Sequence, residues 1–133
     1  MLKSFYTRTS RAENFITMLL SSAKVSSQVF VSHLPITMKQ EWNDLVLVDL
    51  VKGMDKGSHY LFTVNIYLYA RPTGSLQMKN VKVIDAMEEK LRDGIANSVN
   101  KHYDIGIEWS DTGYDSSINF HYNVVSCYVK AHE

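Results

Sequence analysis

The chain has 133 residues, of which 45% are hydrophobic, 11% aromatic and 21% charged. This length and composition are typical of one globular domain, spanning residues 1–133, that can bury a core without disulfides or metals. Fourteen basic and fourteen acidic residues give a formal charge of zero, which disfavours tight binding to a phosphate backbone.

The N-terminal segment, residues 1–11, mixes apolar, basic and hydroxyl residues and lacks the apolar stretch of a signal peptide. Elsewhere no apolar run approaches the roughly 20 residues that a membrane-spanning helix needs, so we expect no contact with a membrane. The single cysteine, Cys127, cannot form an internal disulfide. Its place in a strand-like pattern predicts a packed thiol, which fits a reducing cytoplasm.

The first predicted element is a helix that begins near Ser10. Residues 10–13, Ser-Arg-Ala-Glu, have the spacing in which a serine caps the third amide and a glutamate reaches back. A short strand at residues 29–31 follows, and Pro35 predicts an edge or a loop after it. The apolar face of the helix recurs every three or four residues and consists of Ala12, Phe15, Ile16, Leu19, Leu20 and Ala23.

Two strands joined by a turn are expected in the middle of the chain. Residues 43–51 are apolar at nearly every position except Asp49, the pattern of a strand that is covered on both faces. Residues 60–69 alternate between the two faces of a strand. The turn residues between Gly53 and Gly57 therefore predict an antiparallel hairpin.

A polar corner at residues 71–74 leads into a second helix, which is expected to begin at Gln77 or Asn80 and to end at residue 96. A half-buried strand at residues 103–109 follows, with a turn at residues 111–117. The apolar face of this helix consists of Val83, Ile84, Met87, Leu91 and Ile95.

The last predicted strand, residues 118–131, completes the order α-β-β-β-α-β-β. This order predicts an α+β fold, with a mainly antiparallel sheet of about five strands and two helices on one face. The coincident periodicities of the helices and strands predict a core of Phe15, Ile16, Leu19, Leu47, Phe62, Val64, Ile66, Ile84, Met87, Leu91, Ile107, Phe120 and Val124.

Groups that could carry chemistry are few. Residues 111–113, Asp-Thr-Gly, form the tripeptide of aspartic proteases, but Ser110 and Tyr114 depart from the flanking pattern of those enzymes, and a hairpin turn is expected instead. Cys127 and His121 lie six residues apart on one strand. That separation is about 20 Å, which is too far for proton transfer. The five histidines lack metal-ligand spacing, so we expect no enzyme activity, metal or cofactor.

Tyrosine and tryptophan are more numerous than one small core needs, with 8 Tyr and 2 Trp. Both residue types are enriched where one protein surface covers another. One interpretation is an assembly interface, with Tyr67, Tyr69 and the turn from Gly53 to Gly57 at the contact or the lumen. The other interpretation is that the tyrosines line half-exposed faces of the sheet.

The order and local sequence of these elements resemble the tail-terminator, or tail-completion, proteins of long-tailed bacteriophages and prophages. The resemblance extends from about residue 12 to residue 131. It rests on residues 15–20, the strand at 29–31, the strand at 45–50, the sequence Val-Asn-Ile-Tyr-Leu-Tyr-Ala-Arg at 64–71, the helix at 83–95 and the closing hairpin.

The resemblance implies a structural protein of the virion that is assembled in the cytoplasm of the bacterial host. Such proteins form a homo-oligomeric ring, commonly a hexamer, between the tail tube and the neck, and DNA passes through the lumen without specific binding. Two other classes stay open. One is a small-ligand-binding or regulatory domain with an aromatic pocket between the helices and the sheet. The other is an enzyme whose site is assembled between subunits.

Overall fold

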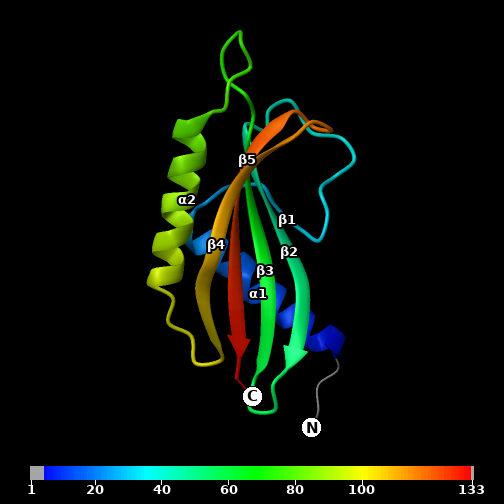
Figure 1. Ribbon diagram of the computed structural model, residues 1–133, viewed down its shortest axis with the longest axis vertical. Helices are drawn as coiled ribbons and strands as arrows, with labels where there is room; N and C mark the ends of the chain where they lie inside the picture. The colour runs from blue at the N-terminus through cyan, green and yellow to red at the C-terminus, as the bar shows by residue number, and fades with distance from the viewer. Residues whose placement is uncertain (1–4, 133) are drawn as a thin grey trace.

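The computed structural model describes the backbone of residues 5–132 and the side chains of residues 8–132. Residues 1–4 and 133 lie outside the described residues. Part of the expectation about a signal peptide concerns residues 1–4. The predicted α+β fold and element order are confirmed. The elements, shown in Figure 1, are α1 (Phe5–Ala23), β1 (Val29–Val31), β2 (Asp44–Asp55), β3 (Tyr60–Ala70), α2 (Val81–Ala96), β4 (Tyr103–Asp115) and β5 (Phe120–Ala131).

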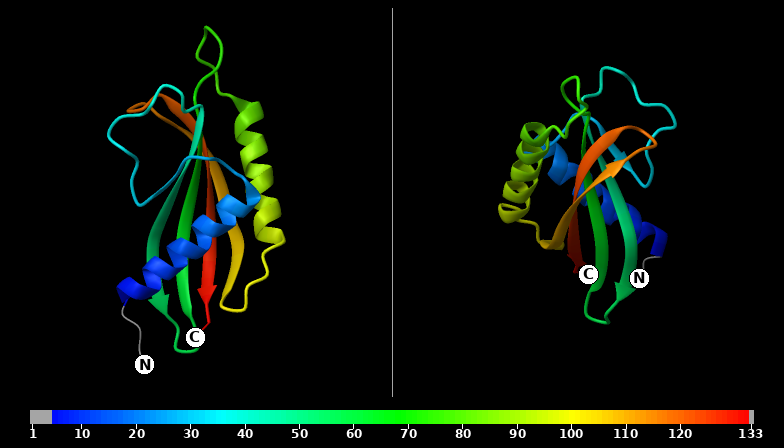
Figure 2. Two further views of the ribbon diagram at one scale, coloured as in Figure 1. Left: turned by 180° about the vertical axis from the view of Figure 1, so that it is seen from behind. Right: turned by 45° about the horizontal axis from the view of Figure 1, so that its top comes forward.

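The strands form one sheet in the order β1-β2-β3-β5-β4. Strand β1 pairs with β2 in parallel, whereas the other three pairings are antiparallel, so the sheet is mixed but mainly antiparallel. Both helices cover the same face of the sheet, with α1 running diagonally across the strands and α2 beside them (Figure 2). No described helix is long and apolar enough to cross a membrane.

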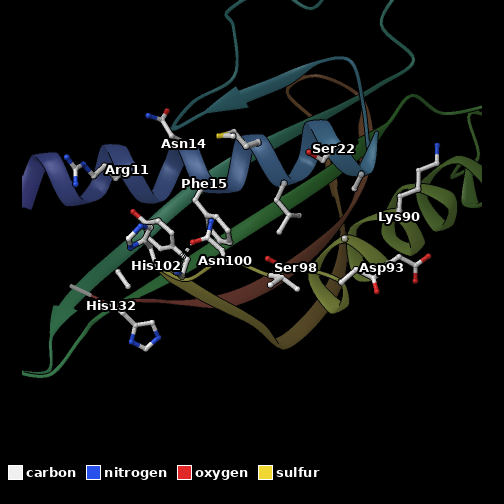
Figure 3. Close-up of a pocket in the computed structure, with 18 of the residues that line it drawn as sticks. Arg11, Asn14, Phe15, Ser22, Lys90, Asp93, Ser98, Asn100, His102 and His132 are labelled. Carbon is white, nitrogen blue, oxygen red and sulfur yellow. Dashed lines mark hydrogen bonds between the residues drawn. The ribbon is translucent and has the colours of Figure 1, made fainter.

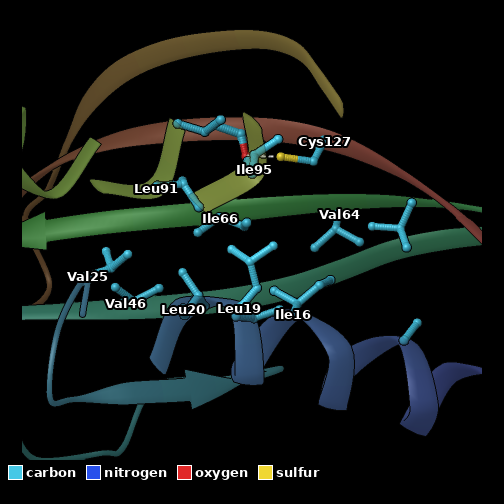
Figure 4. Packing of buried hydrophobic residues seen from close by; sticks show 14 of the residues in the cluster. Ile16, Leu19, Leu20, Val25, Val46, Val64, Ile66, Leu91, Ile95 and Cys127 are labelled. Atoms are coloured by element: carbon cyan, nitrogen blue, oxygen red, sulfur yellow. Dashed lines mark hydrogen bonds between the residues drawn. The ribbon is translucent and has the colours of Figure 1, made fainter. Parts of the chain in front are cut away.

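The main core fills the space between the two helices and the sheet (Figure 4). Ile16 and Leu20 of α1 and Leu91 of α2 are fully buried against Val64 and Ile66 of β3. The predicted core is confirmed for most of its members, but Phe15, Leu47 and Ile107 are only partly buried. The buried members are Ile16, Leu19, Phe62, Val64, Ile66, Ile84, Met87, Leu91, Phe120 and Val124.

A second, smaller cluster lies on the opposite face and explains why β2 is apolar on both sides. Its buried members are Leu45, Tyr69 and Phe120. Residues from the loop between β1 and β2 pack over them, among them Trp42. Arg71 fastens this loop, because its guanidinium donates hydrogen bonds to the carbonyl oxygens of Lys39 (3.1 Å) and Trp42 (3.0 Å). We call Leu45, Tyr69 and Phe120, together with the loop residues that pack over them, the loop-covered cluster.

The predicted start of the first helix is wrong. Helix α1 begins by Phe5, so Ser10 lies inside it and does not cap it. Contacts with the sheet explain the extra length. The guanidinium of Arg8 lies 4.8 Å from the centre of the Tyr60 ring and 4.0 Å from the Asp55 carboxylate. These tertiary contacts stabilise a first turn that local capping signals did not predict.

Both predicted hairpin turns start later than expected. Strand β2 continues through Gly53 to Asp55, and strand β4 continues through Asp111 and Gly113 to Asp115. At Gly53 a Cβ atom would come within 2.6 Å of the Tyr60 ring, so the glycine makes room for a ring on the neighbouring strand instead of forming a turn.

Candidate functional site

The four residues predicted to lie at an interface fall into two separate places. Gly57 is at the tip of the β2–β3 hairpin, with a φ of 88°, and Gly53 pairs with Phe62 just behind it. Tyr67 and Tyr69 lie toward the opposite end of β3. From Phe62 to Tyr69 the strand rises about 23 Å at about 3.3 Å per residue. One small contact therefore cannot include both places, and their role at an interface stays a prediction.

Tyr69 is not exposed, contrary to what the interface interpretation assumed. Its side chain is 4% exposed and belongs to the loop-covered cluster. The Tyr69 ring centre lies 6.0 Å from that of Tyr67 and 5.3 Å from that of Tyr122. Burial raises the pKa of the Tyr69 hydroxyl above its usual value. Part of the tyrosine surplus thus serves a second core.

Two strand glycines on the sheet face that carries no helix are each covered by a tyrosine of β5. A Cβ atom at Gly106 would come within 2.5 Å of the Tyr128 ring, and one at Gly113 would collide with the Tyr122 ring. Each glycine pairs directly with the tyrosine that covers it. Sequence reasoning missed both contacts, although a glycine inside a strand is a signal for close approach.

Strand β4 forms one edge of the sheet and is strongly acidic. It carries Asp104, Glu108, Asp111 and Asp115 and no lysine or arginine. The ladder shifts register between Ile107 and Trp109, which leaves Glu108 in a bulge. Trp109 pairs with Ser126, and its side chain is 49% exposed. Tryptophan is enriched among the residues that contribute most to binding at protein interfaces.

A groove of about 810 Å³ opens between α1, α2 and the loop that leads into β4 (Figure 3). Its lining includes Phe15 and Tyr103, whose rings stack with centres 4.7 Å apart, and the buried Leu19. Gly94 allows the two helices to approach closely, because a Cβ atom there would lie 3.0 Å from the Cβ of Ala23. The groove therefore has an apolar floor.

The rim of this groove is basic. Arg8, Arg11 and Lys90 belong to it, and among the described residues that line it Asp93 is the only carboxylate. The Arg8 guanidinium lies near Asp55, so Arg11 and Lys90 are the exposed cations of the rim. Met18 adds an apolar side chain that is 70% exposed. An apolar floor inside a basic rim suits an occupant that combines an apolar group with negative charge. We call this surface the helix groove.

The candidate nucleophile is poorly placed for chemistry. Cys127 is fully buried, and burial raises the pKa of its thiol to about 12. Asp111, the aspartate of the protease-like tripeptide, is paired within the β4–β5 ladder opposite Val124. Within residues 5–132 no group of three or more His, Cys, Asp or Glu residues could hold a metal ion.

No protein-family model matches the sequence, and no curated protein matches it. The fold is nevertheless similar to a chain in the solved structure of the virion of a native gene transfer agent (GTA) particle. The TM-score is 0.54, the sequences are 11% identical, and the match covers 86% of this chain and 84% of the other. At that identity the similarity establishes a shared fold.

Proposed function

We propose that this chain is a structural protein of a bacteriophage-like particle, which forms a homo-oligomeric ring at the junction between tail and neck. The observation that carries the proposal is the fold, which is shared over 86% of the chain with a chain from a gene transfer agent virion. The expected role is tail termination or head–tail joining, with six subunits as the expected number. The protein has no enzymatic activity in this role.

The surface of the molecule supports assembly as its function. The acidic strand β4 and the basic rim of the helix groove segregate opposite charges on a chain whose formal net charge is zero. Segregated charges orient and select partners more than they add affinity. The partners in this proposal are further copies of the chain and the tail-tube and neck proteins, and DNA passes through the lumen without specific binding. The ring is part of the virion and assembles in the host cytoplasm.

Light scattering across a wide range of protein concentrations, followed by negative-stain imaging, tests this proposal. A ring predicts a mass that is a fixed multiple of 15.2 kDa, together with particles that have a central hole. A tail-tube protein, added at equal concentration, is expected to bind the ring at one end. A protein that stays monomeric at every concentration and does not assemble on a tail tube would refute the proposal.

A second candidate is a small-ligand-binding domain, and the helix groove favours it. A volume of about 810 Å³ is within the range of small-molecule sites, and the apolar floor with a basic rim fits an amphipathic anion. Dodecanoate is a suitable probe. A rise in the midpoint of thermal unfolding with probe concentration, in a monomeric protein, would favour this candidate over the ring.

A further inference from the structure

We propose that Trp109 and Asp111 of one copy insert into the helix groove of the next copy, and that this contact closes the ring. The inference rests on the proposed ring function and names the two surfaces that form its repeated contact. It follows from three features of the molecule. Trp109 is an exposed indole on an acidic strand, and the helix groove has an apolar floor and a basic rim that suit an indole beside a carboxylate. The indole and the groove lie on opposite faces of the sheet.

The inserting surface is built by the bulge in β4. Trp109 pairs with Ser126, which in turn pairs with Asn65 of β3. Asn65 lies between the core residues Val64 and Ile66, so it points away from the helices, and directly opposed residues of a ladder point to the same side. Trp109 therefore lies on the face without helices. Asp111, two residues on, lies on the same face.

The receiving surface is the helix groove. Its floor offers the stacked rings of Phe15 and Tyr103 to an indole, and aromatic pairs attract one another beyond the apolar area that they bury. On the rim, Arg11 is exposed, and Asp93 lies at the other end of the groove (Figure 3). In this contact the Trp109 indole of one copy packs on the floor of the groove of the next copy, and the Asp111 carboxylate pairs with the Arg11 guanidinium of that next copy.

The geometry fits a ring. A contact between two different surfaces is heterologous, and it repeats from copy to copy until the rotation closes. Surfaces on opposite faces of the sheet leave each copy free to donate one indole and receive another. In such a contact the indole supplies most of the affinity, because tryptophan is a frequent hot spot. The carboxylate and guanidinium fix the register, as charged groups do at interfaces.

Charge exchange tests the contact. The single variants Asp111→Lys and Arg11→Glu are each expected to raise the dissociation constant of the oligomer at least tenfold, because each places like charges together. The double variant, which carries both changes, restores opposite charges and is expected to recover most of the wild-type affinity. Trp109→Thr is expected to raise the dissociation constant about 30-fold, the effect of a hot spot of about 2 kcal/mol.

Asp85→Lys is the matched control, because Asp85 is an exposed carboxylate on the outer surface of α2. It is expected to leave the dissociation constant unchanged. Circular dichroism and thermal unfolding are used to check that each variant is folded. If both single charge variants and Trp109→Thr form rings with the dissociation constant of the wild type, this contact is wrong and the ring proposal stays intact. A wild-type protein that never associates would overturn both, and binding of dodecanoate by that monomer would identify the groove as a ligand site.

Discussion

The substitution Leu91→Ala measures how much the packing of α2 on the sheet contributes to stability. Leu91 is 0% exposed and belongs to the main core. Removing three carbon atoms forfeits about 2.4 kcal/mol at about 0.8 kcal/mol per buried methylene. The cavity left behind adds to this loss, so we expect a decrease of about 3–4 kcal/mol in the free energy of unfolding, within the ~2–5 kcal/mol found for such changes.

The expected decrease corresponds to a large thermal shift. At about 2.1 cal/mol/K per residue, 133 residues have an unfolding entropy of about 0.28 kcal/mol/K. A loss of 3 kcal/mol therefore lowers the midpoint of thermal unfolding by about 11 °C. Calorimetry or circular dichroism at one fixed protein concentration measures this shift, since association changes the midpoint with concentration.

Leu76→Ala is the matched control, because it makes the same chemical change at a side chain that is 81% exposed. It is expected to shift the free energy of unfolding by less than about 0.5 kcal/mol. If Leu91→Ala lowered the midpoint of thermal unfolding no more than Leu76→Ala does, the conclusion that Leu91 packs α2 against the sheet would be refuted.

Three further predictions concern the loop-covered cluster, the thiol and the protease-like tripeptide. Tyr69→Asp is expected to unfold the loop-covered cluster and not merely to separate subunits, because Tyr69 is only 4% exposed. Tyr69→Phe should keep a midpoint of thermal unfolding close to that of the wild type, and a folded Asp variant with an unchanged midpoint would contradict this burial. Because the pKa of Cys127 is raised from 9.0 to about 12, the unfolded chain releases the thiol proton first. Stability should therefore fall as the pH rises from about 9 towards 12, and Cys127→Ala should lessen the fall, while equal slopes in both proteins would argue against it. Asp111→Asn and the wild type should both fail to cleave a peptide library at acid pH, and cleavage by the wild type alone would make Asp111 a catalytic residue.

Local periodicity was enough to predict the order of the elements and most of the main core. The apolar positions of α2 recur every three or four residues and do face the sheet, with Ile84, Met87, Leu91 and Ile95 buried. The alternation of β3 likewise placed Phe62, Val64 and Ile66 in the core. These features depend on residues close together in the sequence, because one face of a single helix or strand decides burial.

The candidate site was only partly predictable. Sequence patterns drew attention to Tyr67 and Tyr69 through their residue type, but the chain buries Tyr69 beneath a loop that Arg71 holds in place. Nothing local indicated that Trp109 would stand exposed beside a bulge, or that α1 and α2 would leave a groove between them.

Tertiary structure alone decided where the turns fall and which surfaces remain open. Gly53 and Gly113 resemble turn residues in the sequence, yet both lie within strands, because the rings of Tyr60 and Tyr122 occupy the space beside them. Tyr122 belongs to the strand that pairs with the one carrying Gly113. Such contacts depend on strand register, which is fixed by pairing between segments distant in the sequence and is invisible to any pattern read along a single segment.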